Sequence, residues 1–163
     1  MSLSHKKFHA DLAMGQKGER HVATKLKASY KADKIKWSEK GAKGSDFSLI
    51  FPDGALEVYE VKTDFRAEQT GNLFFEYKCN GRTSGLTATQ ADKWAVLLPH
   101  LQVILVFSPK RMFNYLQSSP RARKIVGGDR MAAEGYVVPI SAVMEKQGVE
   151  VIKTKTNLKS ARL

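Results

Sequence analysis

Two short strand-like runs on either side of a turn constrain this chain more than any other feature. They cover residues 45–51 and 55–62, and Pro52, Asp53 and Gly54 stand between them. Proline, aspartate and glycine each favour a turn, because they preset φ, bond their own backbone or accept a positive φ. The pattern predicts a β-hairpin.

The length of the turn decides which side chains face each other. With a three-residue loop, Phe51 pairs with Ala55, and counting back along the two strands places Asp46 directly opposite Glu60. Directly opposed residues have Cβ atoms about 4.5–5.5 Å apart, so two carboxylates could share one cation. Lys62 lies on the same face as Glu60, about 6.6 Å further along the strand. A two-residue loop would shift the register by one and put the acids on opposite faces.

The rest of the chain predicts a mixed sheet flanked by helices in an α/β fold. Residues 101–107 are nearly all apolar, so we expect a buried strand there. A second helix is expected from Thr87, because Thr87, Ala88, Thr89 and Gln90 have the form of a capping box. The expected elements are a helix over 10–30, strands over 45–51, 55–62 and 72–78, a helix from Thr87, a strand over 101–107, a helix over 110–117 and a strand over 136–140. The core order is therefore α-β-β-β-α-β.

Size and composition favour one soluble domain with a polyanionic partner. We expect a single domain over 1–163, with a core at about 10–118 and a C-terminal extension over 131–163. The formal charge is +11 and the pI about 9.8, so nucleic acid leads the list of partners. Cys79 stands alone and no signal-peptide core or membrane span is visible, so we expect a cytoplasmic protein without a membrane partner.

Two loops are candidates for contact with nucleic acid. Residues 120–130 form a predicted mobile basic loop that carries Arg121, Arg123 and Lys124. The glycine-flanked segment around Arg82 could hold a phosphate through backbone amides, although a plain connecting loop explains it equally well.

Glu19 adds a third acid to the predicted pair of Asp46 and Glu60. It stands in the apolar stripe of the first helix, where a carboxylate is costly unless it has a partner. Alone, it would be explained as a helix-edge residue that reaches solvent. With two acids placed to meet it at the sheet, we expect it to join them.

Acids and a lysine in this arrangement suit hydrolysis of a phosphodiester. Mg²⁺ or Mn²⁺ held by oxygen ligands activates water and shields phosphoryl charge, and a lysine stabilises the charge that develops. The histidines have no zinc-site spacing.

At this point the sequence resembles a known family. Asp46, thirteen residues and then Glu60-Val61-Lys62 match the D-x(n)-(D/E)-x-K signature of the PD-(D/E)XK superfamily. Gly18-Glu19-Arg20 is similar to the acidic helix position of archaeal Holliday-junction resolvases, and segments over 75–94 are similar to small phage-type nucleases of the superfamily. The resemblance covers about 15–108, and Ser45 stands where the family name has proline.

The resemblance implies a restriction-endonuclease-like fold and a Mg²⁺- or Mn²⁺-dependent DNA endonuclease. Glu19, Asp46 and Glu60 would hold the metal or its waters, and Lys62 would serve the nucleophile and the transition state. Because many small nucleases of this kind cut two strands as homodimers, the resemblance also implies a homodimer. Preference for DNA structure or sequence stays open.

Several alternatives remain at the level of sequence. A second E-x-K motif, Glu76-Tyr77-Lys78, could pair with Asp64 as a rival triad, and Glu76 could instead be an accessory ligand. Gln90 could approach the site, although its capping role is simpler. The alternative functions are a non-catalytic nucleic-acid-binding module on the same fold and an RNA-directed nuclease.

Overall fold

The computed structural model describes residues 3–127 and 132–159. The helices are α1 (Leu3–Tyr30), α2 (Ala67–Thr70), α3 (Pro109–Ser118) and α4 (Ile140–Glu145), with 3₁₀ turns η1 (Gly85–Thr87) and η2 (Pro99–Leu101). The strands are β1 (Lys34–Trp37), β2 (Phe47–Ile50), β3 (Leu56–Thr63), β4 (Asn72–Cys79), β5 (Arg82–Thr83), β6 (Lys93–Leu98), β7 (Val103–Phe107), β8 (Arg123–Gly127), β9 (Ala133–Pro139) and β10 (Glu150–Lys153).

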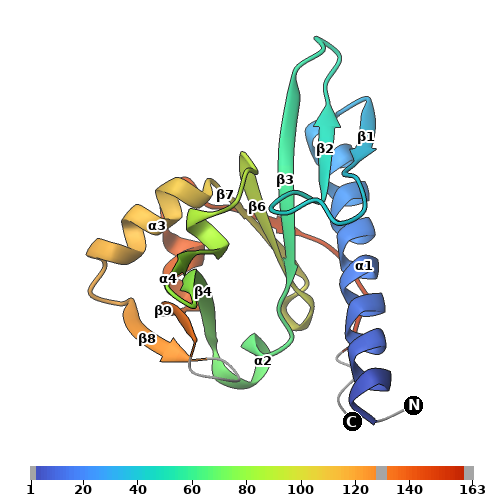
Figure 1. Ribbon diagram of the computed structural model, residues 1–163. Helices are drawn as coiled ribbons and strands as arrows, with labels where there is room; N and C mark the ends of the chain where they lie inside the picture. Colours follow the sequence, from blue (N-terminus) through green and yellow to red (C-terminus); the bar gives the residue numbers. More distant parts are fainter. Residues whose placement is uncertain (1–2, 128–131, 160–163) are drawn as a thin grey trace.

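Within these described ranges the strands form two sheets. The larger sheet has the order β1-β2-β3-β6-β7-β10 and is mixed, because β3 and β6 run parallel while its other pairs run antiparallel. The smaller sheet has the order β5-β4-β9-β8. Figure 1 shows α1 along one side of the larger sheet, with the smaller sheet, α3 and α4 on the other side. The chain is therefore a mixed α/β protein with a mixed sheet flanked by helices, as predicted.

Strands β6 and β7 carry the core on both of their faces. Ala95 and Leu97 pack with Val22 and Leu26 of α1, whereas their neighbours along β6 point away from α1. The residues of these two strands on the side opposite α1 join the cluster formed with β4, β9, α3 and α4; they are Trp94, Val96, Leu98, Val103, Leu105 and Phe107. Burial on both faces suits a continuous apolar run, as was predicted for residues 101–107, of which Val103–Phe107 forms the strand.

The predicted hairpin is confirmed. The Phe51 N–H donates to the Ala55 carbonyl oxygen at 2.9 Å, so the loop has three residues. Phe47 pairs with Tyr59, which is the register expected from the sequence. Asp46, one residue earlier, leaves the ladder, because its N–H donates to the Tyr59 carbonyl at 2.8 Å.

The helix predicted from Thr87 is wrong. Thr87 ends a 3₁₀ turn, and its hydroxyl donates back toward the carbonyls of Tyr77 and Ser84 at 2.5 and 3.0 Å. The following residues become β6, because an apolar run that pairs in parallel with β3 buries both of its faces. The order α-β-β-β-α-β is therefore not observed: a loop and strand β6 stand where the second helix was expected, and β4 belongs to the second sheet.

The predicted loop over 120–130 is only partly observed, because residues 120–122 form a turn but a strand follows. Arg123–Gly127 is strand β8, paired with β9, because Ile125 and Val126 suit an extended backbone. Residues 128–130 of that predicted loop lie outside the described residues. The first helix ends at Tyr30 and the short helix covers Pro109–Ser118, both close to prediction. The elements that were not predicted include β1, α2, α4 and β10.

No helix within residues 3–127 and 132–159 is long and apolar enough to cross a membrane.

The approach of α1 to β3 depends on a missing side chain. A Cβ on Gly18 would lie 2.1 Å from the Oγ1 atom of Thr63, whereas a Cβ on Gly15 of the same helix would meet nothing within 4 Å. Gly18 therefore sets how closely the helix bearing Glu19 can pack on the strand bearing Glu60 and Lys62.

We expect Gly15→Ala and Gly18→Ala to change stability in opposite directions. Both gain helix propensity, up to about 1 kcal/mol. Only Gly18→Ala overpacks the contact with Thr63, so its free energy of unfolding should fall by about 1–2 kcal/mol. Urea unfolding followed by circular dichroism measures both. Adding Thr63→Ala to Gly18→Ala should restore stability, and equal stability of the two alanine variants would show that the contact is loose.

Candidate active site

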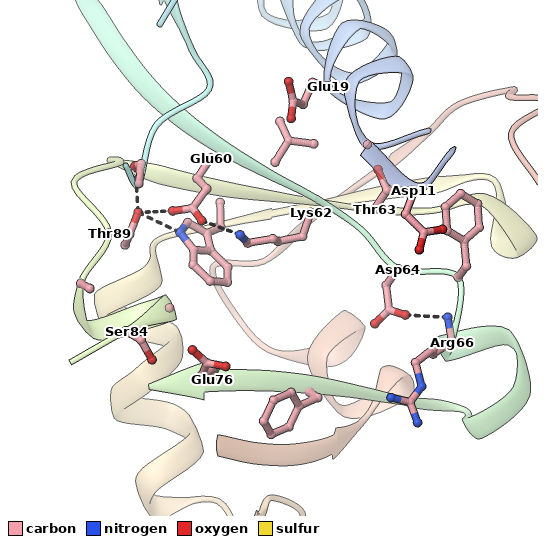
Figure 2. Close-up of a pocket in the computed structure, with 18 of the residues that line it drawn as sticks. Asp11, Glu19, Glu60, Lys62, Thr63, Asp64, Arg66, Glu76, Ser84 and Thr89 are labelled. Carbon is pink, nitrogen blue, oxygen red and sulfur yellow. Dashed lines mark hydrogen bonds and ion pairs between the residues drawn. The ribbon is translucent and has the colours of Figure 1, made fainter. Parts of the chain in front are cut away.

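A cleft of about 800 Å³ opens between β3 and the smaller sheet, with α1 at its rim. Its charged lining residues are Asp11, Glu19, Lys43, Glu60, Lys62, Asp64, Arg66 and Glu76. Five carboxylates thus face three basic side chains, although the whole chain carries a formal +11. Figure 2 shows Glu60 and Lys62 on one wall and Glu76 reaching in from the opposite wall. A basic protein that gathers acids in this cleft has an arrangement suited to a cation there.

Glu60 is the most buried carboxylate of the cleft. Its side chain comes from β3, on the face away from α1, and the residue is only 8% exposed. Lys62 Nζ lies 2.7 Å from Glu60 Oε1, and the Thr89 hydroxyl donates to Glu60 Oε2 at 2.6 Å. The Lys62 ammonium also lies 5.3 Å from the centroid of the Trp94 ring. Both oxygens of this buried carboxylate therefore have a partner, which offsets the cost of burying a polar group.

Asp46 lies where β2 stops. The Val61 N–H would meet the next carbonyl of β2 if the ladder continued; instead it donates to Asp46 Oδ2 at 2.6 Å. Burial raises the pKa of the Asp46 carboxyl, and the negative charge of Glu60 raises it further, against the lowering effect of the Val61 hydrogen bond. Asp46 is therefore not the ladder partner of Glu60 that the sequence predicted, because the register begins at Phe47. It lies at the margin of the sheet and outside the lining of the cleft, where the charge of Glu60 still acts on it.

Glu19 faces Asp46 from α1. Burial raises the pKa of the Glu19 carboxyl, and the charge of Asp46 raises it further. Among the described residues, no hydrogen bond or ion pair holds the Glu19 carboxylate. Figure 2 shows it on the other side of β3 from Glu60. The structure therefore brings Glu19 to Asp46 and Asp46 to Glu60, but Glu19 and Glu60 do not meet directly.

The carboxylate oxygens of Asp46 and Glu60 suit a hard metal cation that takes few of its ligands from the protein. Within residues 3–127 and 132–159, no group of three or more acidic, histidine or cysteine side chains is gathered tightly enough to hold a metal. Mg²⁺ is usually held by one or two carboxylates, keeps several waters and takes its other ligands from substrate phosphates. Asp46 and Glu60 fit that pattern, because both supply carboxylate oxygens, Glu60 from the wall of the cleft and Asp46 from just outside its lining.

The rival motif does not assemble as a triad. Glu76 and Asp64 both line the cleft, as Figure 2 shows, but Lys78 points to Glu134 on β9, with Nζ 3.7 Å from Oε2. Asp64 Oδ1 accepts from the Arg66 and Ala67 N–H groups at 2.8 and 2.9 Å, so it shapes the start of α2. Glu76 remains placed as an accessory acid.

The other predicted contact residues lie outside the lining of the cleft. Gln90 is exposed in the loop before β6, and Arg82 is exposed on β5. Arg121 is held by Glu145 at 3.2 Å and by Ser141 at 2.9 Å. Arg123 and Lys124 lie on edge strand β8, where Lys124 Nζ is 5.5 Å from the centroid of the Tyr77 ring.

Thr89 is the functional candidate that sequence reasoning missed. Besides donating to Glu60, its Oγ1 lies 3.1 Å from the Trp94 Nε1–H and 3.2 Å from the Ala91 N–H, both of which donate to it. Gly44 packs against the same loop with φ +74°, and a Cβ there would lie 3.1 Å from Thr89 Cα. The sequence did not predict this role of Thr89, because residues 87–90 were interpreted as the capping box of a helix. Lys43 and Arg66 also line the cleft, and no spacing in the sequence pointed to them.

The chain matches no family model, no curated protein and no solved structure.

We expect Thr89→Val to destabilise the fold and Thr89→Ser to preserve it. Valine has the shape of threonine but leaves Glu60 Oε2 without its donor and the Trp94 N–H without its acceptor, which costs about 1–3 kcal/mol for each buried group left unpaired. Urea unfolding measures the loss, and serine keeps the hydroxyl. If valine is as stable as threonine, the hydroxyl does not hold these groups.

We expect Glu19→Gln to stabilise the fold at neutral pH and to lose that effect in acid. The folded-state pKa of Glu19 is raised above its ordinary value of 4.5, so the folded protein takes up the proton first as pH falls. Above the raised pKa the wild type therefore carries the full cost of the charge, and below 4.5 it carries none. Melting temperatures across this pH range test the sign, and a difference that grows in acid would contradict it.

Proposed function

We propose that this chain is a metal-dependent DNA nuclease with a restriction-endonuclease-like core. One observation carries the proposal: the hairpin register and the end of β2 bring Asp46 beside Glu60, with Lys62 2.7 Å from the Glu60 carboxylate. Glu60 and Lys62 at the wall of a cleft, with Asp46 just outside its lining, in a chain of formal charge +11, suit hydrolysis of a polyanion.

Asp46 and Glu60 would hold a Mg²⁺ or Mn²⁺ ion. Bound there, the ion would supply a nucleophilic water at neutral pH and offset charge on the phosphoryl oxygens. Glu19 borders the cleft and interacts with Asp46, so its role is to receive or orient water beside the ligands. Without a cation, the five carboxylates of the cleft would repel a phosphate, which is why the acids favour a metal site over a simple anion site.

Lys62 supplies the mobile positive charge. Its side chain is 51% exposed, so the ammonium is free to leave Glu60 and to approach a phosphoryl oxygen or the attacking water. The face of Trp94 limits how far it moves, because the ammonium lies over that ring. A preorganised donor of this kind acts mainly on the charge of the transition state.

A non-catalytic nucleic-acid-binding module is the second candidate. Both Glu60 oxygens already have partners, Lys62 and Thr89, and such a closed pair needs no metal. In that case the chain binds DNA but does not cleave it, whichever divalent metal is added.

A cleavage assay separates these functions. We expect the wild type to cut DNA with Mg²⁺ or Mn²⁺ but not with EDTA, and Asp46→Asn and Glu60→Gln to be inactive. Lys62→Ala should lose about 10²–10³ in single-turnover rate while it keeps its affinity for DNA. Lys78→Ala is the matched control, because Lys78 is held by Glu134 and should change the rate only a few-fold.

The substrates are duplex, single-stranded, branched and flapped DNA, together with matched RNA, and thermal melting checks the fold of each variant. Full activity of Asp46→Asn would refute the assigned ligands. Loss of cleavage in Lys78→Ala with activity retained in Lys62→Ala would move the site to Glu76 and Asp64.

A further inference from the structure

A second hollow adjoins the candidate active site. It measures about 370 Å³ and lies between α1, β1 and the loop that leads into β2. Glu19 lines both this groove and the main cleft, and Asp46 lines the groove. The two hollows therefore meet at the carboxylates proposed to act on the phosphodiester.

The groove exposes an indole beside an aliphatic side chain. Trp37 is 47% exposed and Leu12 is 51% exposed, and both line the groove, Trp37 from β1 and Leu12 from α1. Trp37 is the cross-strand partner of Phe47, whose ring meets it edge to face at 5.8 Å between centroids. This contact holds the indole in place while leaving about half of the side chain open to the groove.

Charged side chains of both signs line the groove beside the indole. The carboxylates are Glu19, Glu39 and Asp46, and the cations are Arg20 and Lys40, to neither of which the structure gives a salt bridge among the described residues. An aromatic face for stacking, next to cations for the backbone, is the combination that binds unpaired nucleotides without sequence preference. Trp37 suits this role better than Phe74, the exposed aromatic of the main cleft, because the Phe74 ring already covers Gly135.

We propose that the groove of Trp37, Leu12, Arg20 and Lys40 binds an unpaired nucleotide of the DNA strand whose phosphate lies at Asp46. The base stacks on the Trp37 indole, and Arg20 and Lys40 contact the flanking phosphates. This inference rests on the proposed nuclease function, and it assigns that site a substrate with single-stranded character. In a fully paired duplex the bases are stacked inside the helix, so one can reach the indole only at the free-energy cost of unstacking it.

Binding in EDTA tests the groove without depending on cleavage. The probes are a fluorescent single-stranded DNA oligonucleotide, an oligonucleotide of the same length made of abasic residues, and a blunt duplex. Trp37→Ala should weaken binding of the single strand about fivefold or more, because stacking on one aromatic contributes about 5- to 150-fold to affinity. Binding of the abasic strand should not change, since it carries the same phosphates but no bases.

Two further variants make the result specific. Trp37→Phe keeps a flat ring and should retain most of the affinity for the single strand. Leu56→Ala removes an equally exposed apolar side chain near the hairpin turn, away from the groove, and should have no effect. In the wild type, the single strand should also protect the exposed Trp37 from quenching by acrylamide, whereas Trp94 is buried and contributes little.

Each contrary result overturns the proposal. If Trp37→Ala binds the single strand as the wild type does, the indole serves another purpose, such as contact with a protein. If it weakens the abasic strand equally, Trp37 acts through structure rather than stacking. Failure of the nuclease function is distinct, because it appears as intact DNA in Mg²⁺ and Mn²⁺ while the binding results in EDTA still stand.

Discussion

The burial of one face of β3 against α1 is the constraint on which the rest of the structure depends. Tyr59 and Val61 pack toward the helix in the same cluster as Val22 and Leu26. Because side chains alternate along a strand, Glu60 and Lys62 must then face the opposite side. Pairing with β2 on one edge and β6 on the other prevents β3 from slipping, since a shift of one residue would exchange the two faces. The cleft and its carboxylates follow from that choice.

The acids of the site make the fold less stable than its packing would allow. Burial raises the pKa of both Asp46 and Glu19, and the charge of Asp46 raises the pKa of Glu19 further. Gly18 lets α1, which carries Glu19, approach β3 closely. A chain of formal charge +11 has many cations, yet none forms an ion pair with these two carboxylates among the described residues. Uncompensated charge of this kind is found where a protein binds or reacts rather than where it only folds.

Local patterns predicted the parts of the fold that local physics controls. The three-residue turn sets the hairpin register, so the Phe47–Tyr59 pairing was predictable from the sequence. The apolar run over 101–107 was predicted as a strand buried on both faces, and Val103–Phe107 forms that strand, after a 3₁₀ turn that ends at Leu101. The segment after Thr87 was predicted incorrectly because its capping pattern and its apolar run are equally compatible with a helix and a strand. Pairing with β3, which lies some thirty residues earlier, decides between them.

The sequence by itself placed Glu60 and Lys62 on one strand face and Asp46 at the start of the neighbouring strand, because one short hairpin carries all three and a three-residue turn sets its register. Tertiary structure alone decided which groups surround them. Thr89 reaches Glu60 only because β6 pairs in parallel with β3. Glu76 faces the cleft only because β4 joins a second sheet. Arg121, which was predicted to contact nucleic acid, forms an ion pair with Glu145. Contacts between segments far apart in the chain depend on how whole elements pack, and no local spacing in the sequence records that packing.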